Sequence, residues 1–147
     1  MTKERFKLMP AVWLIFKKDN KILLLKRKNT GWEDGNYAIP AGKLDGKETV
    51  TQAAIREARE ELGLNINETN LDVAHVLHKI NYDNEETIDF FLNVSDWQGI
   101  PENTEPHKCE ELKWFEVDNF PENMVGCLRH VLKKLEKNIF YSEFGWE

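Results

Sequence analysis

Residues 42–64 read GKLDGKETVTQAAIREAREELGL, and this stretch decides how the whole chain is interpreted. Residues 49–62 contain neither glycine nor proline, are rich in Ala, Glu and Arg, and are followed by Gly63. This pattern predicts an α-helix with a glycine just beyond its last turn. The preceding residues 28–48 carry several glycines and one proline, so we expect a long loop there with a short strand inside it.

Three glutamates of the expected helix, Glu57, Glu60 and Glu61, lie on one arc beside its apolar stripe if residues are placed about 100° apart. Like charges at these spacings repel by a few tenths of a kcal/mol per pair on a bare helix. A divalent cation removes this repulsion, and Mg²⁺ binds through a few carboxylates, several waters and substrate phosphates. The arc therefore indicates a metal site, and a metal that neutralises phosphate charge and orients water can promote hydrolysis of a phosphoanhydride without a serine or cysteine nucleophile.

The same glutamates could instead form a solvated helix face that pairs with Arg56 and Arg59. The complete spacing of residues 42–64 argues against this, because it follows G-x5-E-x7-R-E-U-x-E-E-x-G-U, where U is aliphatic. At ordinary residue frequencies such a pattern matches by chance on the order of once in 10⁸ positions. It resembles the Nudix box, and the resemblance extends over most of the chain, as far as the segment WFEVDNFP.

Membership of the Nudix hydrolases would imply an α/β fold, namely an α/β/α sandwich around a mixed β-sheet. The resemblance also implies a metal site made by three carboxylates and one backbone carbonyl, those of Glu57, Glu60, Glu61 and Gly42. It further implies that Arg56 and Glu48 form a pair that orients the loop and the helix. The implied cofactor is Mg²⁺, for which Mn²⁺ can substitute. Related enzymes often have a second glycine where this chain has Ala41, so a positive φ there would count against activity.

The rest of the chain predicts one domain over residues 1–147. Two apolar runs within residues 8–27 flank a turn at 18–21, which indicates a β-hairpin at the centre of a sheet. Further strands are expected at 37–39, 71–82, 87–94 and 112–117. A second helix is expected at 122–138, with an inward face made by Val125, Leu128, Leu132 and Leu135. The aromatic tail at 139–146 is expected to pack on the domain, or else on a second copy in a homodimer.

Composition narrows the class of partner. The net charge of −6 argues against binding to nucleic acid or to an acidic membrane surface, so the expected partner is a small nucleotide. The apolar run at 11–16 is too short for a signal peptide or a membrane span, and the two cysteines form no motif, which together favour the cytoplasm. His75 and His78 have an odd spacing within an expected strand, which favours structural roles over zinc binding.

The substrate must be inferred from residues outside the box. The segment EPHKC at 105–109 resembles the E-P-x-K-C stretch of a MutT-related subgroup, which implies hydrolysis of a (d)NTP or modified (d)NTP to the monophosphate and pyrophosphate. ADP-ribose, a nucleotide sugar or a dinucleoside polyphosphate remain alternatives, as does a non-catalytic nucleotide-binding regulator. Trp32 and Tyr37 flank the glycine loop and either stack on a nucleobase or pack in the core.

A fourth carboxylate from outside the box could serve as a second metal ligand or as general base. Glu105, Glu110 and Glu111 compete for this role. Strict alternation along a strand would place Glu110 on the same inward face as Leu112 and Trp114. We therefore expect Glu110 to point into the site, with Glu105 as the next candidate and as a substrate contact.

Overall fold

The computed structural model describes residues 3–147, so the first two residues of the predicted domain lie outside it. Its elements follow in the order β1 Met9–Lys18, β2 Lys21–Arg27, β3 Tyr37–Ala38, β4 Ala41–Lys43, α1 Val50–Leu62, the short 3₁₀ helix η1 Glu68–Asn70, β5 Leu71–Ile80, β6 Glu86–Val94, β7 Cys109–Glu116, α2 Gly126–Glu136 and β8 Tyr141–Phe144. No helix within this range is long and apolar enough to cross a bilayer.

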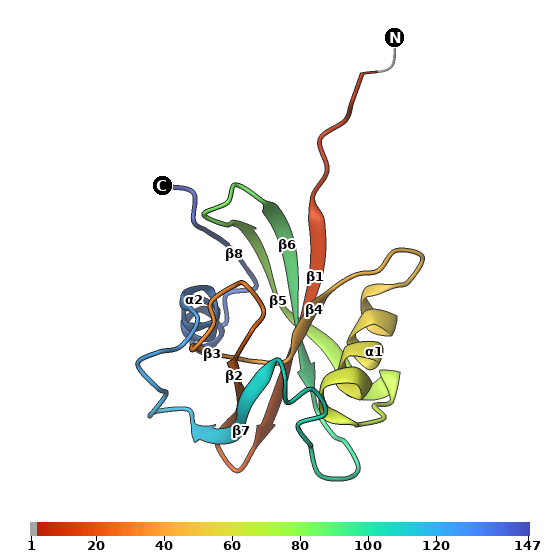
Figure 1. Ribbon diagram of the computed structural model, residues 1–147, viewed down its shortest axis with the longest axis vertical. Helices are drawn as coiled ribbons and strands as arrows, with labels where there is room; N and C mark the ends of the chain where they lie inside the picture. The colour runs from red at the N-terminus through yellow and green to blue at the C-terminus, as the bar shows by residue number, and fades with distance from the viewer. Residues whose placement is uncertain (1–2) are drawn as a thin grey trace.

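The strands form one mixed sheet in the order β3-β2-β1-β6-β5-β8, to which β4 is added beside β1 and β7 beside β2. The predicted hairpin is present, but β1 and β2 pair only next to their turn, at Lys17↔Ile22 and Lys18↔Lys21. Beyond this point the two strands diverge. β1 continues parallel to β6 and antiparallel to β4, whereas β2 pairs with β3 and β7 (Figure 1). The central position predicted for this hairpin is thus confirmed.

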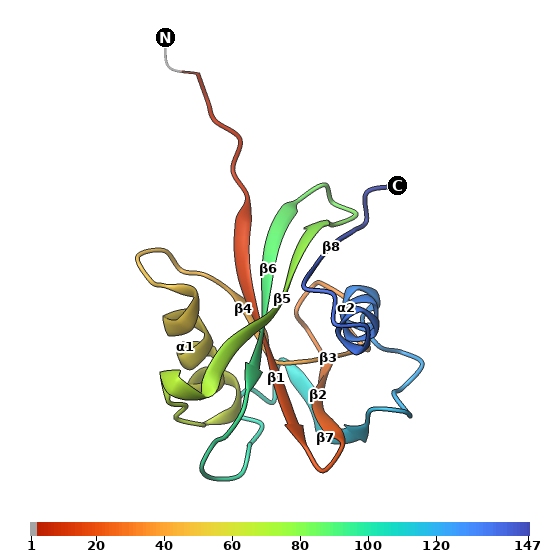
Figure 2. The same cartoon turned by 180° about the vertical axis from the view of Figure 1, so that it is seen from behind.

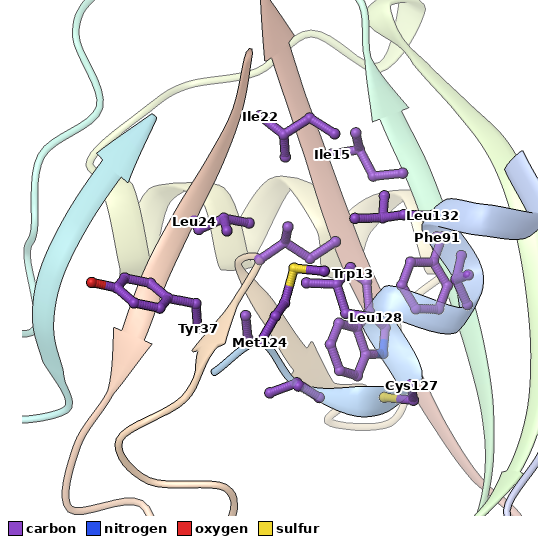
Figure 3. Close-up of a cluster of buried hydrophobic side chains, with 14 of the residues drawn as sticks. Trp13, Ile15, Ile22, Leu24, Tyr37, Phe91, Met124, Cys127, Leu128 and Leu132 are labelled. Carbon is purple, nitrogen blue, oxygen red and sulfur yellow. The ribbon is translucent and has the colours of Figure 1, made fainter. Parts of the chain in front are cut away.

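The two helices cover opposite faces of the sheet (Figures 1 and 2), which confirms the α/β/α sandwich. Strand β1 is buried on both faces because its apolar residues alternate between the two layers. Val12, Leu14 and Phe16 pack in the cluster beneath α1. Trp13 and Ile15 pack on the other side, in the cluster beneath α2 that Figure 3 shows.

Helix α1 begins at Val50, one residue later than predicted, and ends at Leu62 as predicted. Its N-terminus is closed by a capping box between Thr49 and Gln52, and Gly63 ends it with a φ of 69°. The buried face is made mostly of alanines, which let the helix approach the sheet closely. One expectation is wrong: Glu57 belongs to this buried face and does not merely lie beside it.

The second helix begins at Gly126, four residues later than the predicted 122–138. The backbone of Tyr37 accounts for this, because its N–H donates to Asn123 O and its carbonyl accepts from Val125 N–H. Residues 123–125 therefore complete a bridge to β3, which engages Asn123 O, and the helix starts after Val125, its N-cap residue. The expected inward residues Val125, Leu128 and Leu132 are buried nonetheless.

The aromatic tail packs on its own domain as strand β8, which runs parallel to β5. A buried polar network holds it there. His75 is fully buried, its Nδ1 lies 2.8 Å from Ile139 O, and its Nε2 lies 2.8 Å from Ser142 Oγ. His78 lies apart from this network and near Glu86. Both histidines thus have structural neighbours, and no group of three metal-ligating side chains that includes them occurs in residues 3–147.

Candidate active site

A cavity of about 360 Å³ lies where α1 meets the ends of β2 and β4. We call it the acidic cavity, because four carboxylates line it, those of Glu57, Glu60, Glu61 and Glu105. Three of them come from α1. The fourth comes from the loop before β7, some forty residues further along the chain. The fold thus brings the three box glutamates together with one acidic residue from outside the box.

Arg56 is the hub of the ion pairs on the outer side of this cavity. Its Nε and Nη2 form two parallel bonds to the Glu48 carboxylate, at 3.0 and 2.9 Å, in the pairing that the resemblance implied. Nη2 also donates to Lys43 O at 3.1 Å, which ties β4 to α1. Bidentate pairs of this kind fix orientation. The guanidinium lowers the pKa of Glu48 and thereby keeps it ionised.

Glu57 lies directly over Gly42, and this contact explains why the box begins with a glycine. A Cβ atom at position 42 would overlap with the Glu57 carboxylate. Glu57 is only 8% exposed and accepts a bond of 2.7 Å from Arg56 Nη1. Burial raises the pKa of Glu57 to about 7, although the Arg56 guanidinium opposes this shift.

Glu61 is the box carboxylate that bonds to β4. Its Oε2 accepts a bond of 3.0 Å from the N–H of Ala41, the residue that departs from the family pattern. Ala41 is extended, pairs with Trp13 and does not have a positive φ, so its methyl group causes no backbone strain. Desolvation raises the pKa of Glu61 well above its usual range, and the charges of Glu57 and Glu105 raise it further.

Glu60 is the most exposed of the three box glutamates and shares Arg56 Nη1 with Glu57, at 3.2 Å. Within residues 3–147 the side chains do not converge into a complete metal cage. The donor set still fits a hard divalent cation, since it offers carboxylate oxygens, lacks a Cβ at Gly42 and carries repulsive negative charge that a cation would offset. Mg²⁺ commonly binds through such partial sets and completes its shell with water and phosphate.

The expectation that Glu110 points into the interior is wrong. Its side chain is 55% exposed and pairs with Lys26 at 3.3 Å on the outer surface. The cause is a β-bulge: Lys26 pairs with Glu111 and Arg27 with Cys109, which leaves Glu110 as the extra residue. Strict alternation therefore fails at Glu110, the first residue of the segment to which it was applied.

Glu105 occupies the place predicted for Glu110. It lines the acidic cavity, close enough to influence the pKa values of both Glu57 and Glu61. Its backbone is held by a turn, in which its N–H donates to Asn103 Oδ1 and its carbonyl accepts from Lys108 and Cys109 N–H. Its carboxylate has no hydrogen-bond or ion-pair partner among the described side chains and backbone groups.

The two predicted substrate-binding aromatics lie in different places. Trp32 lines a second cavity, of about 350 Å³, that adjoins the acidic cavity. Tyr37 is a core residue instead and belongs to the buried cluster of Figure 3. It is 8% exposed, packs edge-on against Phe115 and donates its hydroxyl to Glu111 at 3.1 Å. Of the two roles considered for Tyr37, core packing is therefore the one that the structure supports and substrate binding is not, because the side chain leaves the short strand β3 toward β7.

Arg27 is a site residue that the sequence prediction missed. It lines both cavities, and its guanidinium donates to Trp32 O at 2.7 Å and to Thr30 Oγ1 at 2.9 Å. Burial lowers its pKa, while Asp34, Glu61 and Glu33 raise it. An arginine that ends a buried strand immediately before a glycine-rich loop was the available signal.

A third cavity, of about 470 Å³, lies between the sheet and α2, away from the box. Glu136 is the one carboxylate among the residues that line it, and its other walls are largely apolar. It therefore lacks the charge needed to bind a metal and phosphates.

Comparison with known proteins identifies the family. The NUDIX domain model matches residues 7–135. The 8-oxo-dGTP diphosphatase of Escherichia coli is 31% identical over 120 residues, which cover 78% of this chain and 88% of that protein. The ADP-ribose pyrophosphatase of Methanocaldococcus jannaschii is 48% identical over 66 residues, but these span only 44% of this chain and 38% of that relative.

The fold leads to the same family. The crystal structure of a MutT NUDIX hydrolase from Burkholderia pseudomallei superposes with a TM-score of 0.80 and 29% identity, covering 87% of this chain and 98% of that one. The structural similarity, the matched domain and the geometry of the box residues all point to the same family. The chain belongs to the Nudix hydrolases.

Proposed function

We propose that this Nudix hydrolase cleaves a nucleoside triphosphate, or a modified one, to the monophosphate and pyrophosphate in a metal-dependent reaction. The observation that carries the proposal is the acidic cavity, in which Glu57, Glu60, Glu61 and Glu105 lie together beside Arg27. Water adds across the bond between the α and β phosphoryl groups. One P–O bond forms, one breaks, and the proton of the water must be accepted.

The box carboxylates are the groups that would hold the metal. Glu57, Glu60 and Glu61, with the backbone carbonyl of Gly42, offer the oxygen ligands that Mg²⁺ prefers, and Mn²⁺ can take the same donors. The bound cation supplies charge neutralisation for the phosphate oxygens. Arg56 and Glu48 position these ligands, since their paired bonds join α1 to the loop that precedes it.

Glu105 is the group we propose as general base. Its carboxylate faces the same cavity as the box glutamates and is not engaged elsewhere, so it is available to accept a proton from water. Arg27 lines the same cavity, so its guanidinium is available to bind a phosphate oxygen. The attacking water, the proton acceptor Glu105 and the anion-binding Arg27 would then surround one phosphoryl group.

The triphosphate assignment is supported by two features. Relatives that are aligned over most of their length are named 8-oxo-dGTP diphosphatases. The E-P-x-K-C segment at 105–109, which points to the MutT-related subgroup, also builds the turn that presents Glu105. A second candidate is ADP-ribose, because the pyrophosphatase relative from Methanocaldococcus jannaschii has the higher local identity.

A substrate panel tests the proposal directly. Purified protein is incubated with (d)NTPs, damaged dNTPs, ADP-ribose, nucleotide sugars and dinucleoside polyphosphates, and the products are identified by chromatography. We expect a triphosphate to give the highest kcat/KM, with pyrophosphate as product, and activity to disappear in chelator because the carboxylates then lack a cation. Highest turnover of ADP-ribose with inert triphosphates, or full turnover in chelator, would contradict the proposal.

Replacing Glu105 by Gln should lower kcat by roughly 10²-fold, because the amide cannot accept the proton. The fold should be unaffected, since the carboxylate makes no bond to other described residues. Glu110→Gln is the matched control: it lies five residues away on the outer surface and should retain near-normal kcat. Steady-state kinetics give kcat for both variants, and melting temperatures show whether they are folded. A Glu105→Gln variant with wild-type kcat would show that Glu105 is not the general base.

A further inference from the structure

The second cavity adjoins the acidic cavity and has a different chemical character. Both are lined by Arg27, Thr30, Ala41 and Gly42, so they meet across β4. We call the second one the aromatic cavity, after its walls Trp13 and Trp32. We propose that it binds the base of the substrate and that the buried Lys79 ammonium recognises a carbonyl oxygen on that base. This inference rests on the proposed function.

The aromatic cavity suits a flat and neutral group better than another phosphate. The rings of Trp13 and Trp32 meet edge to face, with centroids 6.5 Å apart. Charges on the lining balance, since three cationic and three acidic side chains contribute: Arg27, Lys43, Lys79, Asp83, Glu85 and Asp89. The salt bridge of 3.0 Å between Lys43 and Glu85 neutralises one such pair. An anion here would face carboxylates, whereas a heterocycle would face indole rings.

Lys79 has hydrogen-bonding capacity that the described residues do not satisfy. It is only 5% exposed, and its Nζ donates to Asn81 Oδ1 at 2.8 Å. No other hydrogen-bond acceptor and no carboxylate within 4.0 Å completes its shell in residues 3–147. An ammonium group has three donors, and leaving a buried charge poorly partnered is costly. Two donors therefore remain for a ligand in the cavity.

The nearest buried carboxylate is already engaged. Asp89 accepts from Trp13 Nε1 at 2.9 Å and from Thr87 Oγ1 at 2.7 Å, so its two oxygens are held by its own neighbours. In the sheet, Lys79 pairs with Thr87, while Asp89 lies diagonally across from it. Asp89 thus supplies a balancing charge without capturing the ammonium, which leaves Lys79 free to bind a ligand.

A second unused donor belongs to Trp32. Its indole Nε1 is buried and has no partner within residues 3–147. Lys79 Nζ lies 5.1 Å from the centroid of the same ring, so both donors belong to one corner of the cavity. Donors without acceptors favour a ligand that presents an acceptor. Guanine, hypoxanthine and oxidised guanine have a carbonyl oxygen at the position where adenine has an amino group, which is itself a donor.

The test compares purine nucleotides that carry either a carbonyl oxygen or an amino group at this position. We expect wild-type protein to hydrolyse dITP and dGTP with a kcat/KM about 10- to 100-fold higher than dATP, because adenine leaves the buried donors unpaired. Lys79→Met keeps the length of the side chain but removes the donors. It should lower kcat/KM for dITP by about the same factor and leave dATP nearly unchanged. Trp32→Phe removes the other unpaired donor, so it should also reduce the preference for dITP over dATP.

The matched control is Lys113→Met, because Lys113 also lies over an aromatic ring, with Nζ 5.2 Å from the Phe115 centroid, but is itself exposed and lines neither cavity. It should keep the preference of the wild-type protein. A wild-type preference for dATP would overturn the inference, and so would a Lys79→Met variant, folded by its melting temperature, that loses activity equally on all purines.

A binding measurement separates this inference from the proposed function. In metal-free protein, dIMP should shift the NMR signal of the Trp32 indole N–H, identified by its absence in Trp32→Phe, at lower concentration than dAMP. Failure of every triphosphate in the substrate panel would contradict the proposed function alone. Equal or weaker binding of dIMP relative to dAMP would overturn base recognition by Lys79, whichever substrate the panel identifies.

Discussion

Glu61→Gln should lower kcat by about 10²–10⁴-fold while the protein stays folded. The substitution keeps the size of the side chain and removes one negative charge from the acidic cavity, at the carboxylate that bonds to β4. Burial and the charges of Glu57 and Glu105 already disfavour the ionised form of Glu61 when no cation is present. The metal-free variant should therefore melt at the same temperature as the wild-type protein, or higher, because electrostatic repulsion is relieved.

Melting temperatures measured with added Mg²⁺ test whether the effect of Glu61→Gln comes from lost metal binding. A cation that binds only the folded state raises the melting temperature, and the rise should be smaller in Glu61→Gln than in the wild-type protein. Glu116→Gln, on the exposed end of β7, is a charge-matched control that should behave like the wild type in both assays. If Glu61→Gln were folded and fully active, Glu61 would have no part in the reaction.

The sequence predicted best where local and tertiary preferences agree. Helix α1 has a capping box, no helix-breaking residue and a glycine in the left-handed region just past its end, so its bounds follow from local signals alone. The placement of Glu57, Glu60 and Glu61 in one cavity follows from the helical period. The pair between Arg56 and Glu48 was implied by the family pattern and not by composition or periodicity.

Prediction failed where partners distant in the sequence determine the conformation. The bulge opposite Lys26 and Arg27 turns Glu110 outward, and nothing within residues 105–117 signals it. Likewise, the start of α2 is delayed because residues 123–125 bond to Tyr37, which lies more than eighty residues earlier. Both errors arise from pairing between strands, which periodicity within one segment does not encode.

The aromatic cavity was also beyond the reach of sequence patterns. Lys79 and Asp89 lie in two strands that read as ordinary alternating segments, and only the pairing of β5 with β6 places both on one face. Trp32 was considered a possible base contact, yet its partners could not be named. The donors that we assign to base recognition become apparent only when burial and missing acceptors are both known.

Gly42→Ala should lower kcat/KM by on the order of 10²–10³-fold, although it adds a single methyl group. The new Cβ would overlap with the Glu57 carboxylate, which lies directly over Gly42. The carboxylate is the far end of a side chain, so it can move aside at small cost to the fold. That movement breaks its bond to Arg56 and displaces one of the proposed metal ligands, so activity should fall much more than stability.

Ala41→Gly is the matched control for this substitution, since it changes the same pair of residue types one position earlier. Ala41 is extended and contributes its N–H to Glu61, which glycine also provides, so this variant should retain activity within a few-fold. Kinetics at several Mg²⁺ concentrations should show that Gly42→Ala needs more metal, because the ligand geometry is disturbed. A fully active Gly42→Ala would mean that the carboxylate of Glu57 is not required at this position, and the metal site would then have to be built from Glu60 and Glu61.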